Sequence, residues 1–131
     1  IFILITISIV GCRFRESYDS DNVIVENPKM DSIRINIIMR GDTTQLLELF
    51  LSYQKDGKDL EMLPFYTILA DKYNISSVCS DIYYLADEYK AINPQLMDLG
   101  IKYLNKGAKM KDPNCMLILN NLNESNLKKK K

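Results

Sequence analysis

The spacing of apolar residues constrains this chain most, because in Tyr103–Leu122 it follows the period of an α-helix on both sides of a polar turn. After the turn, Cys115 and Leu119 lie four residues apart, on one helical face. Asp112 and Pro113 form a helix start, since aspartate caps a helix and proline fits its first position. The stretch therefore predicts two helices joined by a tight turn.

The same helix-turn-helix pattern recurs twice upstream. We predict six helices, at residues 29–40, 43–55, 59–73, 76–90, 94–109 and 113–124. The second helix of each pair begins its apolar stripe at Leu46, Val78 and Cys115, which are 32 and 37 residues apart. Such spacings are typical of helical solenoid repeats, in which each unit buries its apolar face against its neighbours. We therefore expect an all-α array of three antiparallel helical hairpins.

The first helix has a β-strand as its alternative. Ile33, Ile35 and Ile37 are β-branched and alternate with polar residues, as in a strand. We favour the helix because Gly41 is a natural stop and Asp42 a natural cap for the next helix.

Other helix ends are also suggested by local signals. Asp42 and Gln45 have the spacing of a capping box, which predicts that the second helix begins at 43. Pro64 costs little within the first turn of the third helix, but it would kink a helix that begins earlier. Asn74 or Ser76 is expected to cap the fourth helix.

The last hairpin carries a specific pattern of residues: Tyr103, Leu104, Gly107, Ala108, the turn Asp112-Pro113-Asn114, Cys115 and Leu119. This pattern resembles the SEL-like repeats of the tetratricopeptide superfamily, with Cys115 in place of the usual alanine. The resemblance implies a right-handed superhelix that serves as a scaffold for protein–protein contacts and has no chemistry of its own. Some bacterial members are envelope lipoproteins, and others are immunity proteins that neutralise secreted toxins.

The first twelve residues read as a targeting segment. Residues 1–10 are almost entirely apolar, too short to span a bilayer and the right length for the core of a signal peptide. Since the chain does not begin with Met, we expect the basic region of the signal to precede Ile1. Ile9-Val10-Gly11-Cys12 resembles the lipobox of bacterial lipoproteins, which implies cleavage before Cys12 and a lipid on that cysteine. The alternative is a short strand or an uncleaved anchor, with Cys12 an ordinary buried thiol.

The remaining chain divides by composition. Residues 13–27 are polar and without helical periodicity, as in a flexible tether after a membrane anchor. Residues 28–124 form the helical-repeat domain, and residues 125–131 form a basic tail that we expect to be disordered. Together with the lipobox resemblance, this organisation leads us to expect a protein of the bacterial cell envelope that is attached to a membrane through a lipid on Cys12.

The chain lacks the residues that several classes of function usually require. The charges of the 17 basic and 17 acidic residues cancel, so no strong positive potential favours the binding of nucleic acid. The chain has no histidine, the commonest general base and zinc ligand, and no glycine-rich phosphate loop. The three cysteines match no zinc signature, and Cys79 and Cys115 are expected as small core residues. We therefore expect no catalysis, no cofactor, no metal and no small-molecule substrate.

Five aromatic residues are candidates for a partner-binding groove: Tyr53, Phe65, Tyr66, Tyr83 and Tyr84. Tyrosine suits interfaces because it offers apolar area and a hydroxyl with few rotatable bonds. The alternative is that these rings pack between helices.

The functional hypothesis is therefore a non-enzymatic envelope lipoprotein whose helical repeats bind a protein partner. One alternative is an immunity protein that neutralises a toxin. Another is a small envelope enzyme that uses carboxylates, with Asp81, Asp87 and Glu88 as its acidic residues.

Overall fold

The computed structural model describes residues 27–128 of the chain. Within this part the secondary structure is entirely helical, which confirms the predicted all-α class. The elements are α1 (Pro28–Arg40), α2 (Leu46–Lys55), the 3₁₀ helix η1 (Asp59–Met62), α3 (Leu63–Lys72), α4 (Val78–Tyr89), α5 (Gln95–Lys109) and α6 (Pro113–Lys128).

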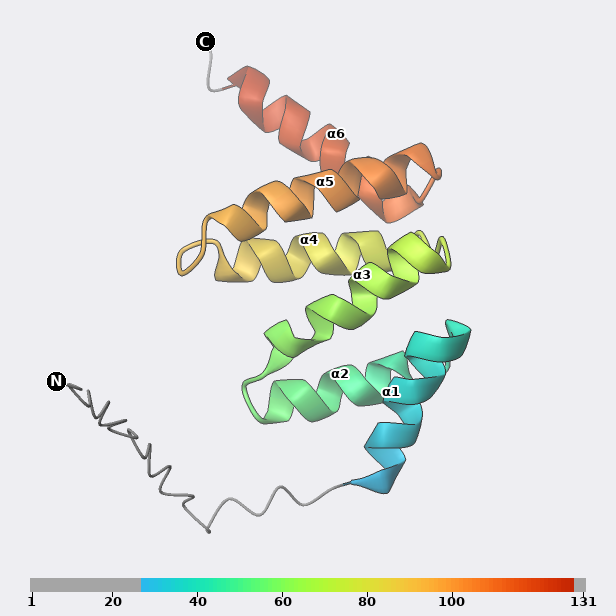
Figure 1. Ribbon diagram of the computed structural model, residues 1–131. Helices are drawn as coiled ribbons and strands as arrows, with labels where there is room; N and C mark the ends of the chain where they lie inside the picture. Colours follow the sequence, from blue (N-terminus) through green and yellow to red (C-terminus); the bar gives the residue numbers. More distant parts are fainter. Residues whose placement is uncertain (1–26, 129–131) are drawn as a thin grey trace, which may run out of the picture.

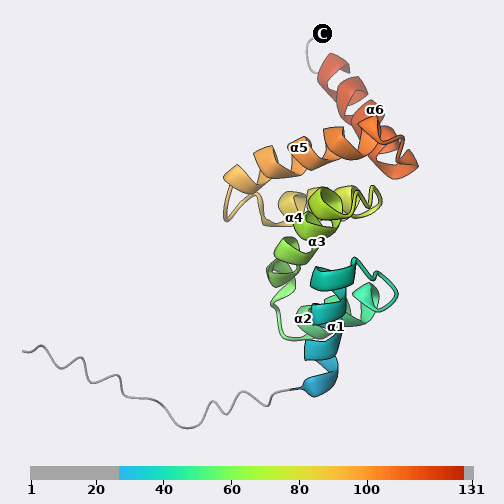
Figure 2. The ribbon, with the colours of Figure 1, turned by 45° about the vertical axis from the view of Figure 1, so that its right-hand side comes forward.

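The helices stack one after another along an elongated body, with α1 and α2 at one end and α6 at the other (Figures 1 and 2). The most extensive contact joins α4 to α5, followed by the contacts of α5 with α6 and of α3 with α4. Two pairs of non-consecutive helices also touch, α1 with α3 and α4 with α6. The α4–α5 pair is therefore the centre of packing in the described chain.

The β-strand alternative for residues 33–38 is wrong, because this segment lies inside α1. Ile33 and Ile37 are one turn apart and both are buried, so the helix places them together on one face. Burial on that face outweighs the β preference of the branched side chains. Gly41 ends the helix with φ +66°, a left-handed conformation that glycine adopts without strain.

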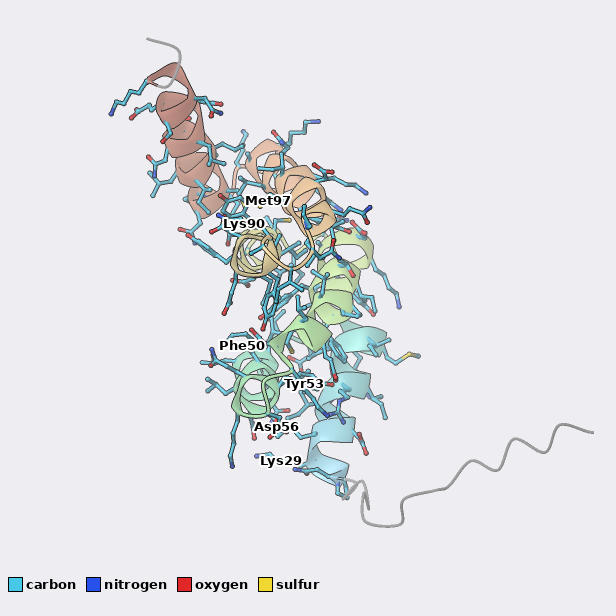
Figure 3. All side chains as sticks on the ribbon, turned by 90° about the vertical axis from the view of Figure 1, so that its left-hand side faces the viewer. Lys29, Phe50, Tyr53, Asp56, Lys90 and Met97 are labelled. Atoms are coloured by element: carbon cyan, nitrogen blue, oxygen red, sulfur yellow. The ribbon has the colours of Figure 1, made fainter. Side chains whose placement is uncertain are left out.

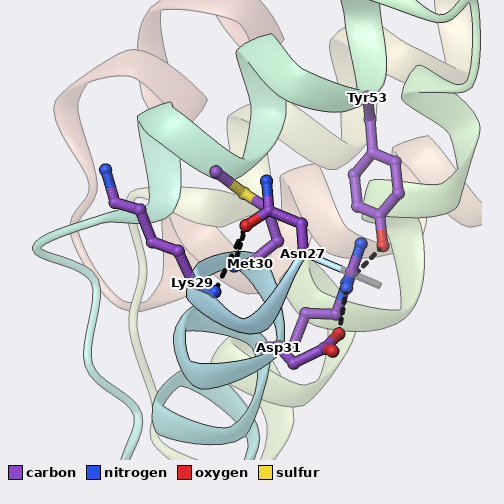
Figure 4. A network of polar contacts seen from close by, with 6 residues as sticks. Asn27, Lys29, Met30, Asp31 and Tyr53 are labelled. Carbon is purple, nitrogen blue, oxygen red and sulfur yellow. Dashed lines mark hydrogen bonds and ion pairs between the residues drawn. The ribbon is translucent and has the colours of Figure 1, made fainter. Parts of the chain in front are cut away.

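The start of α1 is capped by Asn27, whose Oδ1 accepts hydrogen bonds from the backbone N–H groups of Lys29 and Met30 (Figure 4). These bonds satisfy two of the N–H groups that have no partner in the first turn. In the same region, Arg34 donates from Nε to the hydroxyl of Tyr53 at 2.9 Å, which ties α1 to α2.

The predicted start of the second helix is wrong by three residues. Asp42 does not cap α2; its Oδ1 accepts from the backbone N–H of Thr44 at 2.9 Å and from the Thr44 hydroxyl at 2.7 Å. This local turn competes with the helix, as short polar side chains commonly do. α2 therefore begins at Leu46, and Gln45 before it makes no side-chain capping bond.

The predicted third helix consists of two pieces, η1 and α3. Pro64 lies in the first turn of α3, the position where it costs little. Neither Asn74 nor Ser76 occupies the cap position of α4, which belongs to Ser77. Asn74 instead adopts φ +55°, a left-handed conformation in the loop that follows α3.

The predicted cap of the last helix is confirmed, and its predicted end is not. Oδ1 of Asp112 accepts from the backbone N–H of Cys115 at 3.0 Å, and Pro113 is the first residue of α6. The helix runs to Lys128, so residues 125–128, assigned from the sequence to a disordered tail, are helical. The expectations for residues 1–26 and 129–131 lie outside the described residues.

Close contact in the centre of the stack depends on two glycines of α5. A Cβ on Gly100 would lie 2.7 Å from Cβ of Ala86 on α4. A Cβ on Gly107 would lie 2.8 Å from Cβ of Cys79 on α4 and would also collide with Sγ of Cys115 on α6. Only glycine leaves room for helices at this separation. These contacts fix the position of α4, whose opposite side borders the candidate functional site.

Candidate functional site

The five aromatic residues proposed from the sequence do not form one surface. Phe65, Tyr66 and Tyr83 are buried in the core, and Tyr53 is half-buried with its ring centroid 6.3 Å from that of Phe65. Tyr84 is different, because 57% of it is exposed. Packing between helices therefore accounts for most of these rings, and Tyr84 presents the largest free area to a partner.

An apolar pocket of about 280 Å³ lies between α2 and α4, with α3 contributing to its wall. Phe50 lies on the side of α2 that faces α4 (Figure 3). The lining residues are Leu46, Leu47, Phe50, Tyr66, Asp81 and Leu85. Tyr66 is the one aromatic residue from the sequence prediction that lines this pocket.

Exposed apolar side chains border the pocket on both helices. Leu47 is 67% exposed, and Leu51, one turn further along α2, is 52% exposed. On α4, Tyr84 lies three residues after Asp81, so these two side chains are neighbours on the surface of the helix. The pocket is therefore the deepest part of a wider apolar surface that crosses from α2 to α4. We call this surface the α2–α4 groove and define it by the six lining residues together with Leu51 and Tyr84.

Asp81 places a carboxyl group among these apolar walls. Within residues 27–128 it forms no hydrogen bond and no ion pair, and its oxygens keep contact with solvent through the open side of the pocket. Burial, together with the negative charge of Asp112, raises the pKa of Asp81 above its ordinary value. Partial burial therefore destabilises the charged form of Asp81, and no residue of 27–128 forms an ion pair with it.

The sequence groups Asp81 with Asp87 and Glu88, as the carboxylates of a possible small enzyme. The structure separates them: Asp87 forms an ion pair with Lys90 at 2.7 Å, and Glu88 is exposed. The signal that was missed is position, because Asp81 lies three residues after Val78 and therefore on the apolar side of α4.

A second polar cluster joins α3 to α5. Asp71 accepts a hydrogen bond from the Tyr103 hydroxyl at 2.6 Å and from Nζ of Lys106 at 2.7 Å. These bonds, led by the one from Lys106, lower the pKa of Asp71, whereas burial and the bond to Asp71 raise the pKa of Tyr103 to about 12. Each group already has a partner, so this cluster serves as a link between helices.

The two cysteines of the described chain, Cys79 and Cys115, are fully buried in the core on either side of Gly107, as the sequence predicted. Burial, together with a hydrogen bond to Asp112, raises the pKa of Cys115 to about 12. Burial also raises the pKa of Cys79. Thiols in this state carry little of the reactive thiolate form at neutral pH.

Residues 27–128 also lack a metal site and a membrane-spanning helix. These residues contain no group of three or more side chains placed to hold a metal ion. None of the described helices is both long and apolar enough to cross a bilayer.

No family model, no curated protein and no solved structure matches this chain. The likeness to SEL-like repeats and to a lipobox therefore stays a prediction from the residues quoted above.

Because no residue of 27–128 pairs with Asp81, substitution can test how its charge affects the stability of the fold. Because its folded-state pKa is raised, the charged carboxylate destabilises the fold once the pH rises through that pKa. We expect Asp81→Asn to raise the free energy of unfolding at pH 7 by about 0.5–1 kcal/mol, since solvent screens part of the penalty. The gain should vanish near pH 3, below the ordinary pKa of about 3.9, where Asp81 is protonated in both states.

Urea unfolding at both pH values measures this effect. Asp98→Asn is the matched control, since Asp98 is also in a first turn but is exposed on α5. A lower stability of Asp81→Asn at pH 7 would instead assign the carboxylate a structural role.

Proposed function

We propose that this chain is a non-enzymatic module that binds another protein through its helical surface, and that a lipid on Cys12 holds it at a bacterial envelope membrane. The observation that supports binding is the α2–α4 groove, in which an apolar pocket is continuous with exposed Leu47, Leu51 and Tyr84. Exposed apolar surface that is grouped in this way marks interaction sites, whereas single exposed residues do not.

The open surroundings of the pocket favour a protein partner over a small molecule. Pockets that bind small molecules cover most of the ligand. The pocket here, of about 280 Å³, instead opens onto further apolar side chains. It has room for one or two side chains of a partner whose neighbouring residues rest on Leu51 and Tyr84.

We further propose that the helices form three antiparallel hairpins, α1–α2, α3–α4 and α5–α6, arranged in a right-handed superhelix of the SEL-like kind. The contacts of α1 with α3 and of α4 with α6 support this arrangement, because they join corresponding helices of neighbouring hairpins. In such an array the groove lies between the second helices of the first two hairpins.

The proposed anchor is tested by metabolic labelling with a clickable fatty-acid analogue in a bacterial host. We expect the full chain to be labelled and the Cys12→Ser chain to lose essentially all label, because Cys12 is the cysteine of the lipobox-like motif and would carry the lipid. The control is Cys79→Ser, which changes a cysteine outside that motif. Label that persists on Cys12→Ser would rule the anchor out.

The proposed binding function is tested by photo-cross-linking of the full chain in cells. With p-benzoyl-phenylalanine in place of Tyr84, we expect a discrete protein adduct that Leu47→Asp abolishes, since a buried charge in the groove opposes docking. The same photoreactive residue at Lys109, exposed on α5, is the matched control and should give no such adduct. If the photoreactive residue at position 84 formed no protein adduct, the proposal would be contradicted.

A further inference from the structure

Building on the proposed function, we propose that the α2–α4 groove binds an amphipathic helix of a partner protein, and that one lysine or arginine of this helix pairs with Asp81. The occupant is thus defined by its chemistry: apolar side chains along one face, with a single basic residue among them.

Charge complementarity identifies the basic residue. Among residues 27–128, Asp81 is the only charged residue that lines the pocket, and the other five lining residues are apolar or aromatic. Within residues 27–128 no cation pairs with it, whereas Asp31, Asp71 and Asp87 each form an ion pair. A lysine or arginine entering the pocket would supply the missing partner, and its aliphatic stem would contact the leucines around it.

The apolar part of the groove sets the remaining contacts. Leu47 and Leu51 form an exposed ridge one helical turn long on α2, while on α4 buried Leu85 lines the pocket and Tyr84 is exposed. A helix resting against Leu47, Leu51 and Tyr84 presents side chains at positions i, i+3, i+4 and i+7, the usual pattern of helix-in-groove recognition. One basic residue of that pattern would point down towards Asp81.

A helix fits this site better than an extended strand. Strand addition requires an open sheet edge, and the described residues form no strand. The surface around the pocket is instead made of helix side chains, against which a helix packs by fitting ridges into grooves.

Two occupants from the same chain would also supply a basic residue. One is the segment before α1, which contains Arg13 and Arg15 on either side of Phe14. The other is a second copy of the chain. Both contradict the proposal as stated, so the experiment separates them from a partner helix.

The test is a selection from a phage-displayed library of amphipathic helical peptides of about 16 residues, long enough to form a helix when bound. The targets are the full chain, Asp81→Lys and the matched control Asp98→Asn. We expect the full chain and Asp98→Asn to enrich peptides with one lysine or arginine between apolar residues three or four positions away. Asp81→Lys should enrich aspartate or glutamate at that position, because the sign of the pocket charge is reversed.

Affinities of a selected peptide give the quantitative result. We expect Asp81→Asn to weaken binding at least about tenfold and Asp98→Asn to change it less than about twofold. Asp81→Asn keeps the shape of the side chain, so it remains informative if Asp81→Lys fails to fold. No enrichment from the full chain, or the same peptides from Asp81→Lys, would overturn the proposal.

Two controls identify the alternative occupants. Peptides that bind only after Arg13→Glu and Arg15→Glu would show that the preceding segment fills the groove. Dimerisation of the full chain that Asp81→Lys abolishes would assign the groove to a second copy. A Tyr84 photo-adduct that survives Asp81→Lys would overturn the pairing with Asp81 and leave the binding function standing.

Discussion

The close approach of α5 to α4 is the constraint on which the rest of the structure depends. Gly107 contacts Cys79 on α4 and Cys115 on α6 at the same point, so one missing side chain sets the positions of three helices. Gly100 allows a second close approach of α5 to α4, at Ala86. With one side of α4 fixed in this way, the residues that face away from α5 are held towards α2. The groove is therefore a consequence of the packing at the centre of the stack.

The sequence predicted the helices well because helix formation depends on residues that are close in the chain. The spacing of Ile33 and Ile37, and the start at Asp112 and Pro113, are local signals of this kind. The errors at helix ends are local as well: Asp42 bonds to Thr44 rather than capping α2. Which polar side chain competes for a backbone N–H depends on distances of a few tenths of an ångström, and residue type alone does not fix them.

The candidate site was predicted only in part, because it depends on contacts between residues about 30 positions apart. The sequence marks Tyr66 and Tyr84 as candidates for a partner-binding groove, but it does not show which aromatic rings are covered by neighbouring helices. The pocket is lined by residues of α2, α3 and α4, and no spacing pattern in the sequence encodes how these three helices meet. The position of Asp81 on the apolar side of α4 follows from the sequence, whereas the absence of a partner for it within residues 27–128 becomes visible only in three dimensions. A carboxyl group whose pKa is raised by burial among apolar side chains is a candidate for a functional site.

The most direct test of this account is the stability of Gly107→Ala, measured by urea unfolding against the exposed control Lys109→Ala on the same helix. Replacing glycine by alanine inside a helix usually adds about 0.5–1 kcal/mol of stability. Here the new Cβ would lie 2.8 Å from Cβ of Cys79, an atom that cannot move without the backbone of α4. We therefore expect Gly107→Ala to lose about 1–3 kcal/mol, the usual result of overpacking. A variant as stable as the wild type, or more stable, would contradict the claim that close packing on α5 holds α4 in place.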